Sequence, residues 1–151
     1  INEEKFYSFF MDIDNFGSFN KQHGQHIGDV VLAKVAHELL NSFYKHKIKG
    51  GVYRKGGEEF VVICNIQNEE FVYYIAEDLR RAVESLAVDG IDDKVTISIG
   101  VAYCADGNGE EAIKEADGFM RDAKASGKNT IRPQLENLAE ILQKYAVKEY
   151  A

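Results

Sequence analysis

The fold of this chain is decided by residues 54–64, which read RKGGEEFVVIC. Gly56 and Gly57 separate a short strand-like segment from an apolar run, which is the pattern of a tight β-hairpin. Glu58 and Glu59 follow the glycines, and adjacent strand residues point to opposite faces of a sheet. Because glycine has no Cβ, its backbone can approach a ligand closely. The stretch therefore predicts a hairpin whose tip presents two acids beside an accessible backbone.

A second acidic cluster, Asp12-Ile13-Asp14, ends an aromatic-rich, strand-like run over residues 5–11. A lone pair of acids at a strand end most often faces solvent. Two such clusters at neighbouring strand ends, however, predict a divalent-cation site, because hard cations prefer oxygen ligands. The spacing also resembles the start of an EF-hand loop, but Phe16 and His23 occupy positions that need oxygen ligands, which excludes that alternative.

Composition places the chain among single globular domains. It has 151 residues, of which 45% are hydrophobic, enough for one sizeable core. The net charge of −7 argues against nucleic-acid binding, which needs a basic face. No apolar stretch approaches the ~20 residues that span a bilayer, so no direct membrane contact is expected. The chain begins at Ile1, and we expect it to be part of a longer protein. Cys64 and Cys104 are expected to be buried, reduced thiols.

Hydrophobic periodicity predicts alternating helices and strands. We expect strands over 5–11, 51–64 (the hairpin), 95–104 and 129–132. We expect helices over 15–23, 29–44, 68–86, 112–127 and 135–145, with Asn68 as an N-cap and Asp29 at or near a helix start. This order predicts an α+β fold, in which a mixed, largely antiparallel central sheet of about five strands is flanked by helices.

Taken together, these motifs resemble the GGDEF family of diguanylate cyclases. The resemblance covers most of the chain, from about Phe6 to Arg132. Its signature is Gly56-Gly57-Glu58-Glu59-Phe60, a GGEEF form. The other matching segments are Phe9–Phe16, Asn20, Gly24, Ile27–Asp29, Leu32, Thr96–Ala102, Ala116-Asp117 and Ala123–Asn129.

The resemblance implies a palm-like nucleotidyl cyclase fold over residues 1–132, followed by a C-terminal amphipathic helix or linker over 133–151. It implies a cytoplasmic enzyme that condenses two GTP molecules into cyclic di-GMP and releases pyrophosphate. Each subunit of a homodimer would hold one GTP, and the dimer would be needed for catalysis. A fused sensor or phosphodiesterase domain is expected in the full-length protein. Nucleic acid is not an expected partner.

The resemblance also assigns roles to individual residues. Mg²⁺, with Mn²⁺ as a substitute, would be held by Asp12, the Ile13 carbonyl and Glu58. Asp12, Glu58 and Glu59 would be catalytic, with Glu59 either a metal ligand or a group that helps to deprotonate the attacking hydroxyl. The implied substrate-binding residues are Asn15, Phe16, Gly17, Asn20, Asp29, Lys124 and Lys128. Lys124 and Lys128 would contact the β- and γ-phosphates. Asn20 and Asp29 would read guanine, whose N–H donors suit a carboxylate acceptor.

The sequence departs from the family pattern at several positions. Gly17 stands where lysine is usual, Lys21 where aspartate is usual, and residues 47–50 lack the Arg-x-x-Asp of an inhibitory product site. Feedback through that site is therefore not expected. A non-catalytic GTP-binding module that regulates a fused domain remains open as a second hypothesis, favoured by Gly17 and Lys21. A cyclase with mixed dinucleotide products is a third, disfavoured by Asp29.

Overall fold

The computed structural model describes residues 5–150 and contains one five-stranded sheet with the strand order β2-β3-β1-β4-β5. All neighbouring strands are antiparallel except β4 and β5, which are parallel. The sheet is therefore mixed and largely antiparallel, as predicted. The elements are, in chain order, β1 (Phe6–Ile13), α1 (Phe16–His23), α2 (Gln25–Tyr44), β2 (Lys49–Gly56), β3 (Glu59–Asn65), α3 (Glu69–Glu84), β4 (Ile97–Cys104), a 3-10 turn (Ala105–Gly107), α4 (Gly109–Ala125), β5 (Ile131–Arg132) and α5 (Leu138–Tyr150).

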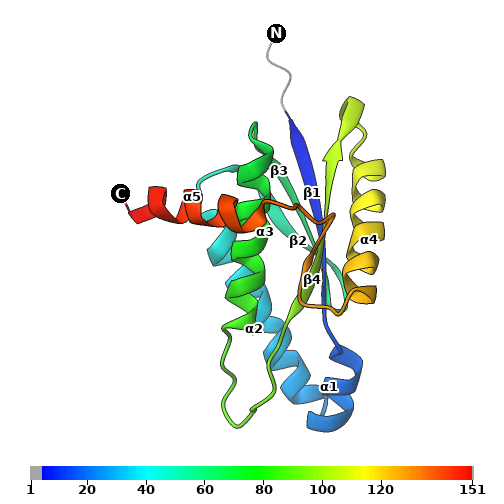
Figure 1. The fold of residues 1–151 in the computed structure, drawn as a ribbon. Coiled ribbons are helices and arrows are strands. Elements are labelled where there is room, and N and C mark those ends of the chain that lie inside the picture. Colours follow the sequence, from blue (N-terminus) through cyan, green and yellow to red (C-terminus); the bar gives the residue numbers. More distant parts are fainter. Residues whose placement is uncertain (1–4, 151) are drawn as a thin grey trace.

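Helices cover both faces of the sheet (Figure 1). Because side chains alternate along a strand, β1 feeds two hydrophobic clusters. Phe9 and Met11 belong to the larger cluster, with residues of α2 and α3, whereas Phe10 packs with Ala116 and Met120 of α4. All three β1 side chains are at most 1% exposed. The central strand is thus fixed from both sides, and its carboxyl end is a rigid support for the acids that follow.

The helix ends follow the local sequence, with one correction. Asn68 caps α3, as predicted, because its side chain accepts a hydrogen bond of 2.9 Å from the Glu70 N–H. The helix predicted over 29–44 begins earlier than expected: α2 starts at Gln25, so Asp29 lies near its start but one turn inside it. The reason is Gly24, whose φ of 90° lets α1 end and α2 begin at one residue.

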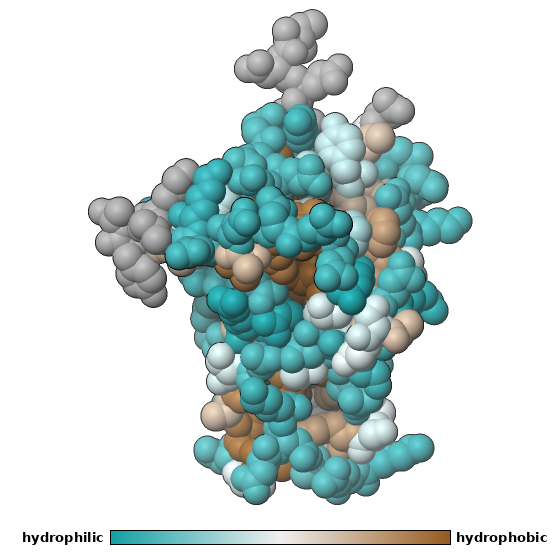
Figure 2. All heavy atoms as spheres, viewed as in Figure 1, coloured by the Kyte–Doolittle hydropathy of each residue, from teal (hydrophilic) through white to brown (hydrophobic). Residues whose placement is uncertain are grey.

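The C-terminal helix α5 is attached to the rest of the fold through α3. Tyr145 accepts a hydrogen bond of 2.8 Å from Asn68 Nδ2, and its ring lies 5.3 Å from that of Phe71. Ile141 is 2% exposed and belongs to the larger core cluster. In Figure 2, hydrophobic atoms show beside the start of this helix on an otherwise mainly hydrophilic face. The division of the chain at residue 132 remains a prediction.

Two further expectations concern thiols and membranes. Cys64 and Cys104 are both free; Cys64 is buried, but Cys104 is only half-buried, since it lies at the end of β4.

Within residues 5–150, no helix combines the length and the apolar character needed to cross a membrane.

Candidate active site

The site is built where β1 ends next to the β2–β3 hairpin. Asp12 is the cross-strand partner of Glu59 on one side and of Ser98 on the other. The Ile13 N–H donates a hydrogen bond of 3.2 Å to the Glu58 carbonyl, so the hairpin turn is attached directly to this end of β1. Burial, followed by the charges of Glu58 and Asp14, outweighs the effect of Lys124 and raises the pKa of Asp12. The structure thus brings the acids at positions 12, 58 and 59 to one corner of the sheet.

Lys124, in the last turn of α4, inserts its ammonium group into this corner. Its Nζ lies 2.7 Å from Asp12 Oδ1, 3.1 Å from the Ile13 carbonyl oxygen and 3.0 Å from Asp14 Oδ1. The helix reaches the strand because α4 packs directly on β4 and β1. Several negative or partially negative oxygens therefore converge on one cationic position, which is the electrostatic signature of a site that takes cations.

Asp14 supports the site from within the fold. Its side chain is 1% exposed and accepts hydrogen bonds from Thr96 Oγ1 at 2.7 Å and Ser98 Oγ at 2.6 Å. Burial alone would raise the pKa of Asp14, but the bonds from Ser98, Thr96 and Lys124 outweigh it and hold that pKa below its ordinary value. The sequence indicated Asp14 only as a member of an acidic cluster at a predicted cation site, and not in this supporting role. The sequence signal for this role is the pair Thr96 and Ser98, whose hydroxyl groups lie on the same face of one strand because they are two residues apart.

The loop between β1 and α1 carries the next predicted residues. Asn15 adopts a left-handed conformation with φ of 56°, and its side-chain oxygen accepts a hydrogen bond from Lys128 Nζ. Phe16 is 7% exposed and belongs to the core, so only its backbone can face a ligand. Gly17 is exposed in the first turn of α1. The loop thus contributes backbone N–H groups around the end of β1, and the cationic side chains of Lys124 and Lys128, which come from α4 and the residues after it, lie beside it.

The two predicted base-reading residues lie on α1 and α2. Asn20 Oδ1 is buried and has no hydrogen-bond partner within the described part of the chain. It lies against Gly28, where an added Cβ would stand 1.8 Å from that oxygen, so any larger residue at position 28 would have to displace the Asn20 side chain. Asp29 follows Gly28 and is exposed. Since a buried acceptor without a donor is costly, Asn20 is a candidate for donation from a ligand.

The donor set at the end of β1 suits a magnesium ion that is shared with a substrate. Two carboxylates, Asp12 and Glu58, and the Ile13 carbonyl supply oxygen atoms. Among residues 5–150, no group of three or more His, Cys, Asp or Glu side chains is arranged to hold a metal ion by itself. Mg²⁺ typically uses one or two carboxylates, water and substrate phosphates rather than such a cage. The residues present therefore fit this ion with a phosphate-bearing ligand.

Comparison with known proteins shows the family of this chain. The family model described as "Diguanylate cyclase, GGDEF domain" matches residues 2–130. The chain is 36% identical over 132 residues to Diguanylate cyclase A of Treponema denticola, covering 85% of this chain and 35% of that protein. It is 32% identical over 129 residues to diguanylate cyclase VdcA of Vibrio cholerae, covering 82% of this chain and 37% of the relative. The chain thus spans about a third of the length of these relatives.

Solved structures of similar proteins cover a similar share of this chain. Diguanylate cyclase SiaD of Pseudomonas aeruginosa, solved with its activator SiaC, superposes with a TM-score of 0.77 at 28% identity, covering 84% of this chain and 49% of that one. The coiled coil and GGDEF domain of DgcB from Caulobacter crescentus, in complex with c-di-GMP, gives a TM-score of 0.76 at 25% identity, covering 85% and 69%. Because the family model matches most of this chain, the chain belongs to the GGDEF diguanylate cyclase domain family.

Proposed function

We propose that this domain is a Mg²⁺-dependent diguanylate cyclase that condenses two GTP molecules into cyclic di-GMP as a dimer. The observation that carries the proposal is the position of Lys124 Nζ, within 2.7–3.1 Å of oxygens of Asp12, Ile13 and Asp14. A cationic group is already stabilised where a metal ion and a triphosphate would have to meet. Family membership is the basis for the proposed reaction. The charges around Asp12 and Lys124 are the basis for placing that reaction at the end of β1.

The residues of the corner have separable roles in this proposal. Asp12, Glu58 and the Ile13 carbonyl would hold the ion, which when bound offsets phosphate charge and lowers the pKa of the attacking 3′-hydroxyl. Lys124 and Lys128 would bind the β- and γ-phosphates. Glu59, opposite Asp12 across the strands, remains either a ligand or the group that helps to deprotonate the hydroxyl. Positioning would carry most of the rate, because phosphoryl transfer leaves little covalent chemistry for side chains.

The base would bind between α1 and α2. The unpaired Asn20 Oδ1 can accept a hydrogen bond from the guanine edge, and the exposed Asp29 carboxylate can accept others. Adenine has no N1–H donor, so a site built on these acceptors would leave them unsatisfied with ATP. Discrimination by such hydrogen bonds reaches about 10⁴-fold. Because GTP is available in the cytoplasm, we also propose that the domain lies there.

The wider protein enters the proposal only through its relatives. One relative, MucR of Pseudomonas aeruginosa, is named as a bifunctional diguanylate cyclase/cyclic di-GMP phosphodiesterase, and this chain covers 19% of it. Others of about 30% identity are named as uncharacterized membrane proteins of Staphylococcus aureus. A fused sensor, phosphodiesterase or membrane-anchored region is therefore proposed for the full-length protein.

A GTP-binding module without turnover is the second candidate, and Gly17 favours it. The family lysine that could add to triphosphate binding is absent there, and Lys21 is exposed on α1 four residues later. The retained acids at positions 12, 58 and 59 favour the enzyme.

Incubation with GTP and Mg²⁺ at high protein concentration tests the proposal. We expect cyclic di-GMP and pyrophosphate, and we expect Glu58→Ala to reduce the rate by at least about 10²-fold, because a charge-stabilising group is lost. Product is measured by liquid chromatography, and pyrophosphate by a coupled assay. Glu115→Ala, which removes an exposed glutamate on α4, is the matched control and should retain the rate. Tight GTP binding without any product would instead establish the regulatory module.

A further inference from the structure

We infer that Asn129 and Arg80 are positioning residues for the triphosphate, through a polar network that joins α3 to both phosphate-binding lysines. This inference rests on the proposed function, in which Lys124 and Lys128 contact the phosphates. Neither Asn129 nor Arg80 would touch the substrate. They would fix the backbone and side chains that do.

Asn129 is the central member of the network. Its backbone N–H donates to Asp14 Oδ2 at 3.0 Å, its Oδ1 accepts from Arg80 Nη1 at 2.8 Å, and its Nδ2 donates to Glu84 Oε2 at 2.5 Å. Every polar group of the side chain is therefore used. The residue also has a φ of 49°, in the left-handed region that asparagine tolerates better than most residues. These contacts hold one residue of the α4–β5 loop in a single conformation.

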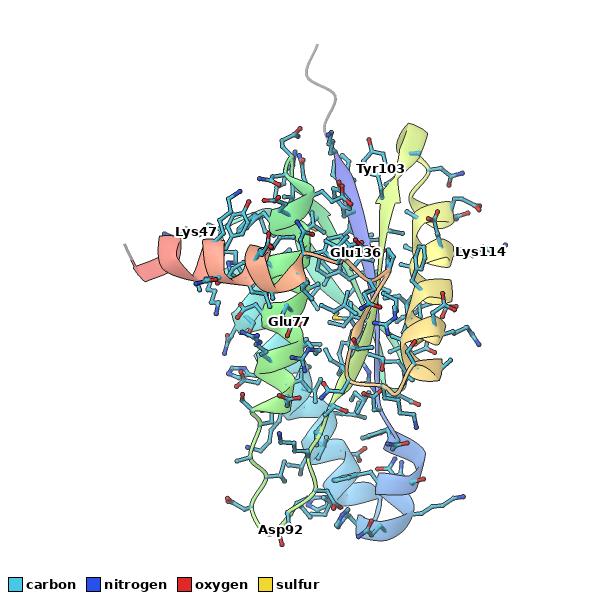
Figure 3. The ribbon with its side chains drawn as sticks, in the orientation of Figure 1. Lys47, Glu77, Asp92, Tyr103, Lys114 and Glu136 are labelled. Carbon is cyan, nitrogen blue, oxygen red and sulfur yellow. The ribbon has the colours of Figure 1, made fainter. Side chains whose placement is uncertain are left out.

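Arg80 anchors this residue to α3. Its side chain is 14% exposed and forms a two-pronged ion pair with Glu77, whose side chain is 8% exposed. Arg80 Nη1 also lies 3.0 Å from Glu84 Oε2. Glu77 lies midway along α3, as Figure 3 shows. A half-buried guanidinium that is paired with two carboxylates is held in one geometry and can orient the amide that it contacts.

The network ends at the lysines that the proposed function uses. Asp14 accepts from Asn129 N–H and also lies 3.0 Å from Lys124 Nζ. Lys128 directly precedes Asn129, has a φ of 66°, and donates to Asn15. A displacement of Asn129 would therefore move Lys128 through the backbone and Lys124 through Asp14. The guanine-reading residues on α1 and α2 have no bond to the network among the residues that the structure describes.

The test compares ligands that do and do not carry the distal phosphates. Asn129→Gly removes the side-chain bonds but permits the left-handed φ and keeps the backbone N–H to Asp14. We expect it to weaken binding of α,β-methylene-GTP, which cannot react, by about tenfold, the effect of losing one charge-assisted contact. Binding of GMP, which lacks the β- and γ-phosphates, should change by less than about twofold. Both affinities are measured by calorimetry in magnesium buffer, with thermal unfolding recorded in parallel.

Matched controls separate positioning from a general loss of stability. Arg81→Ala removes a residue that pairs with the same Glu77 oxygen at 3.1 Å but is 59% exposed and makes no bond to Asn129. Lys47→Gly places glycine at another left-handed position, with φ of 55°. Both should bind the two ligands as the unsubstituted protein does. Arg80→Ala should reproduce the Asn129→Gly pattern.

Two outcomes overturn the inference alone: an Asn129→Gly protein that binds α,β-methylene-GTP normally, or one that loses affinity equally for both ligands. A wild-type chain that binds no α,β-methylene-GTP would overturn the inference together with the proposed function.

Discussion

At the scale of single residues, Asp12 and Asp14 show how one short segment serves both function and stability. Burial and Glu58 raise the pKa of Asp12, so its ionised form is held at a cost that a bound cation would offset. Asp14 has a lowered pKa because hydrogen bonds from Ser98, Thr96 and Lys124 outweigh its burial. The first acid is arranged for a ligand, whereas the second holds the strand ends together.

The sign of each shift gives a prediction for thermal unfolding without nucleotide. With a folded-state pKa below the ordinary ~3.9, Asp14 stabilises the fold fully above that value, and this contribution is lost as pH falls through the lowered pKa. Asp14→Asn should therefore cost about 2 kcal/mol at neutral pH, because charge-assisted hydrogen bonds are lost, and the deficit should shrink in acid. Asp12 has a raised pKa, so its ionised form lowers stability as pH rises through that value. Asp12→Asn should leave Tm unchanged or higher.

Differential scanning calorimetry from acidic to neutral pH decides this prediction, with each variant acting as the control of the other. A greater loss of Tm in Asp12→Asn than in Asp14→Asn at neutral pH would contradict it. Catalysis should follow the opposite ranking, since Asp12 is assigned to the metal ion.

At the scale of elements, the contact between β4 and α4 places Lys124. An added Cβ on Gly100 would stand 1.9 Å from the Ala116 carbonyl oxygen and 2.3 Å from the Met120 nitrogen, so strand and helix touch by their backbones. Gly100→Ala should cost about 1–3 kcal/mol or more by overpacking, since helix backbone cannot yield as a side chain can. By moving α4 it should also weaken GTP binding.

Gly118, on the exposed side of the same helix, is the natural control. An added Cβ there meets nothing within 4 Å, so Gly118→Ala should stabilise the protein by roughly 0.5–1 kcal/mol through helix propensity. Urea unfolding of both variants measures the difference. Equal stability of the two alanine variants would show that the backbone contact does not constrain α4.

The elements also show what could be predicted from sequence. Local signals sufficed for the hairpin and for the Asn68 cap, because each depends on neighbours within a few residues. They missed the first turn of α2, which begins at Gln25 rather than at residue 29, because the apolar period of this helix is established only after that turn. The contact of Arg80 with Asn129 joins residues 49 apart, and no periodicity along the chain encodes such a pairing. The acids and lysines of the site could be named from sequence, but the network that holds them required the fold.

At the scale of the whole molecule, the proposed reaction needs two copies of a chain whose net charge works against their association. The net charge is −7, which makes copies repel one another, and the face shown in Figure 2 is mainly hydrophilic. Each copy would hold one GTP, so a single copy could not carry out the condensation. We therefore expect the isolated domain to be mostly monomeric and slow.

This expectation predicts the order of the reaction in protein. When a weak dimer is the active species, its concentration rises with the square of total protein. The rate of cyclic di-GMP formation at saturating GTP and Mg²⁺ should then give a slope of about 2 on logarithmic axes. Fusion to a parallel two-stranded coiled coil should raise the rate and reduce the slope to about 1, because the coiled coil keeps two copies together at all concentrations. A slope of about 1 for the unfused domain, unchanged by the fusion and measured where sedimentation shows a monomer, would mean that one copy completes the reaction and that the dimeric mechanism is wrong.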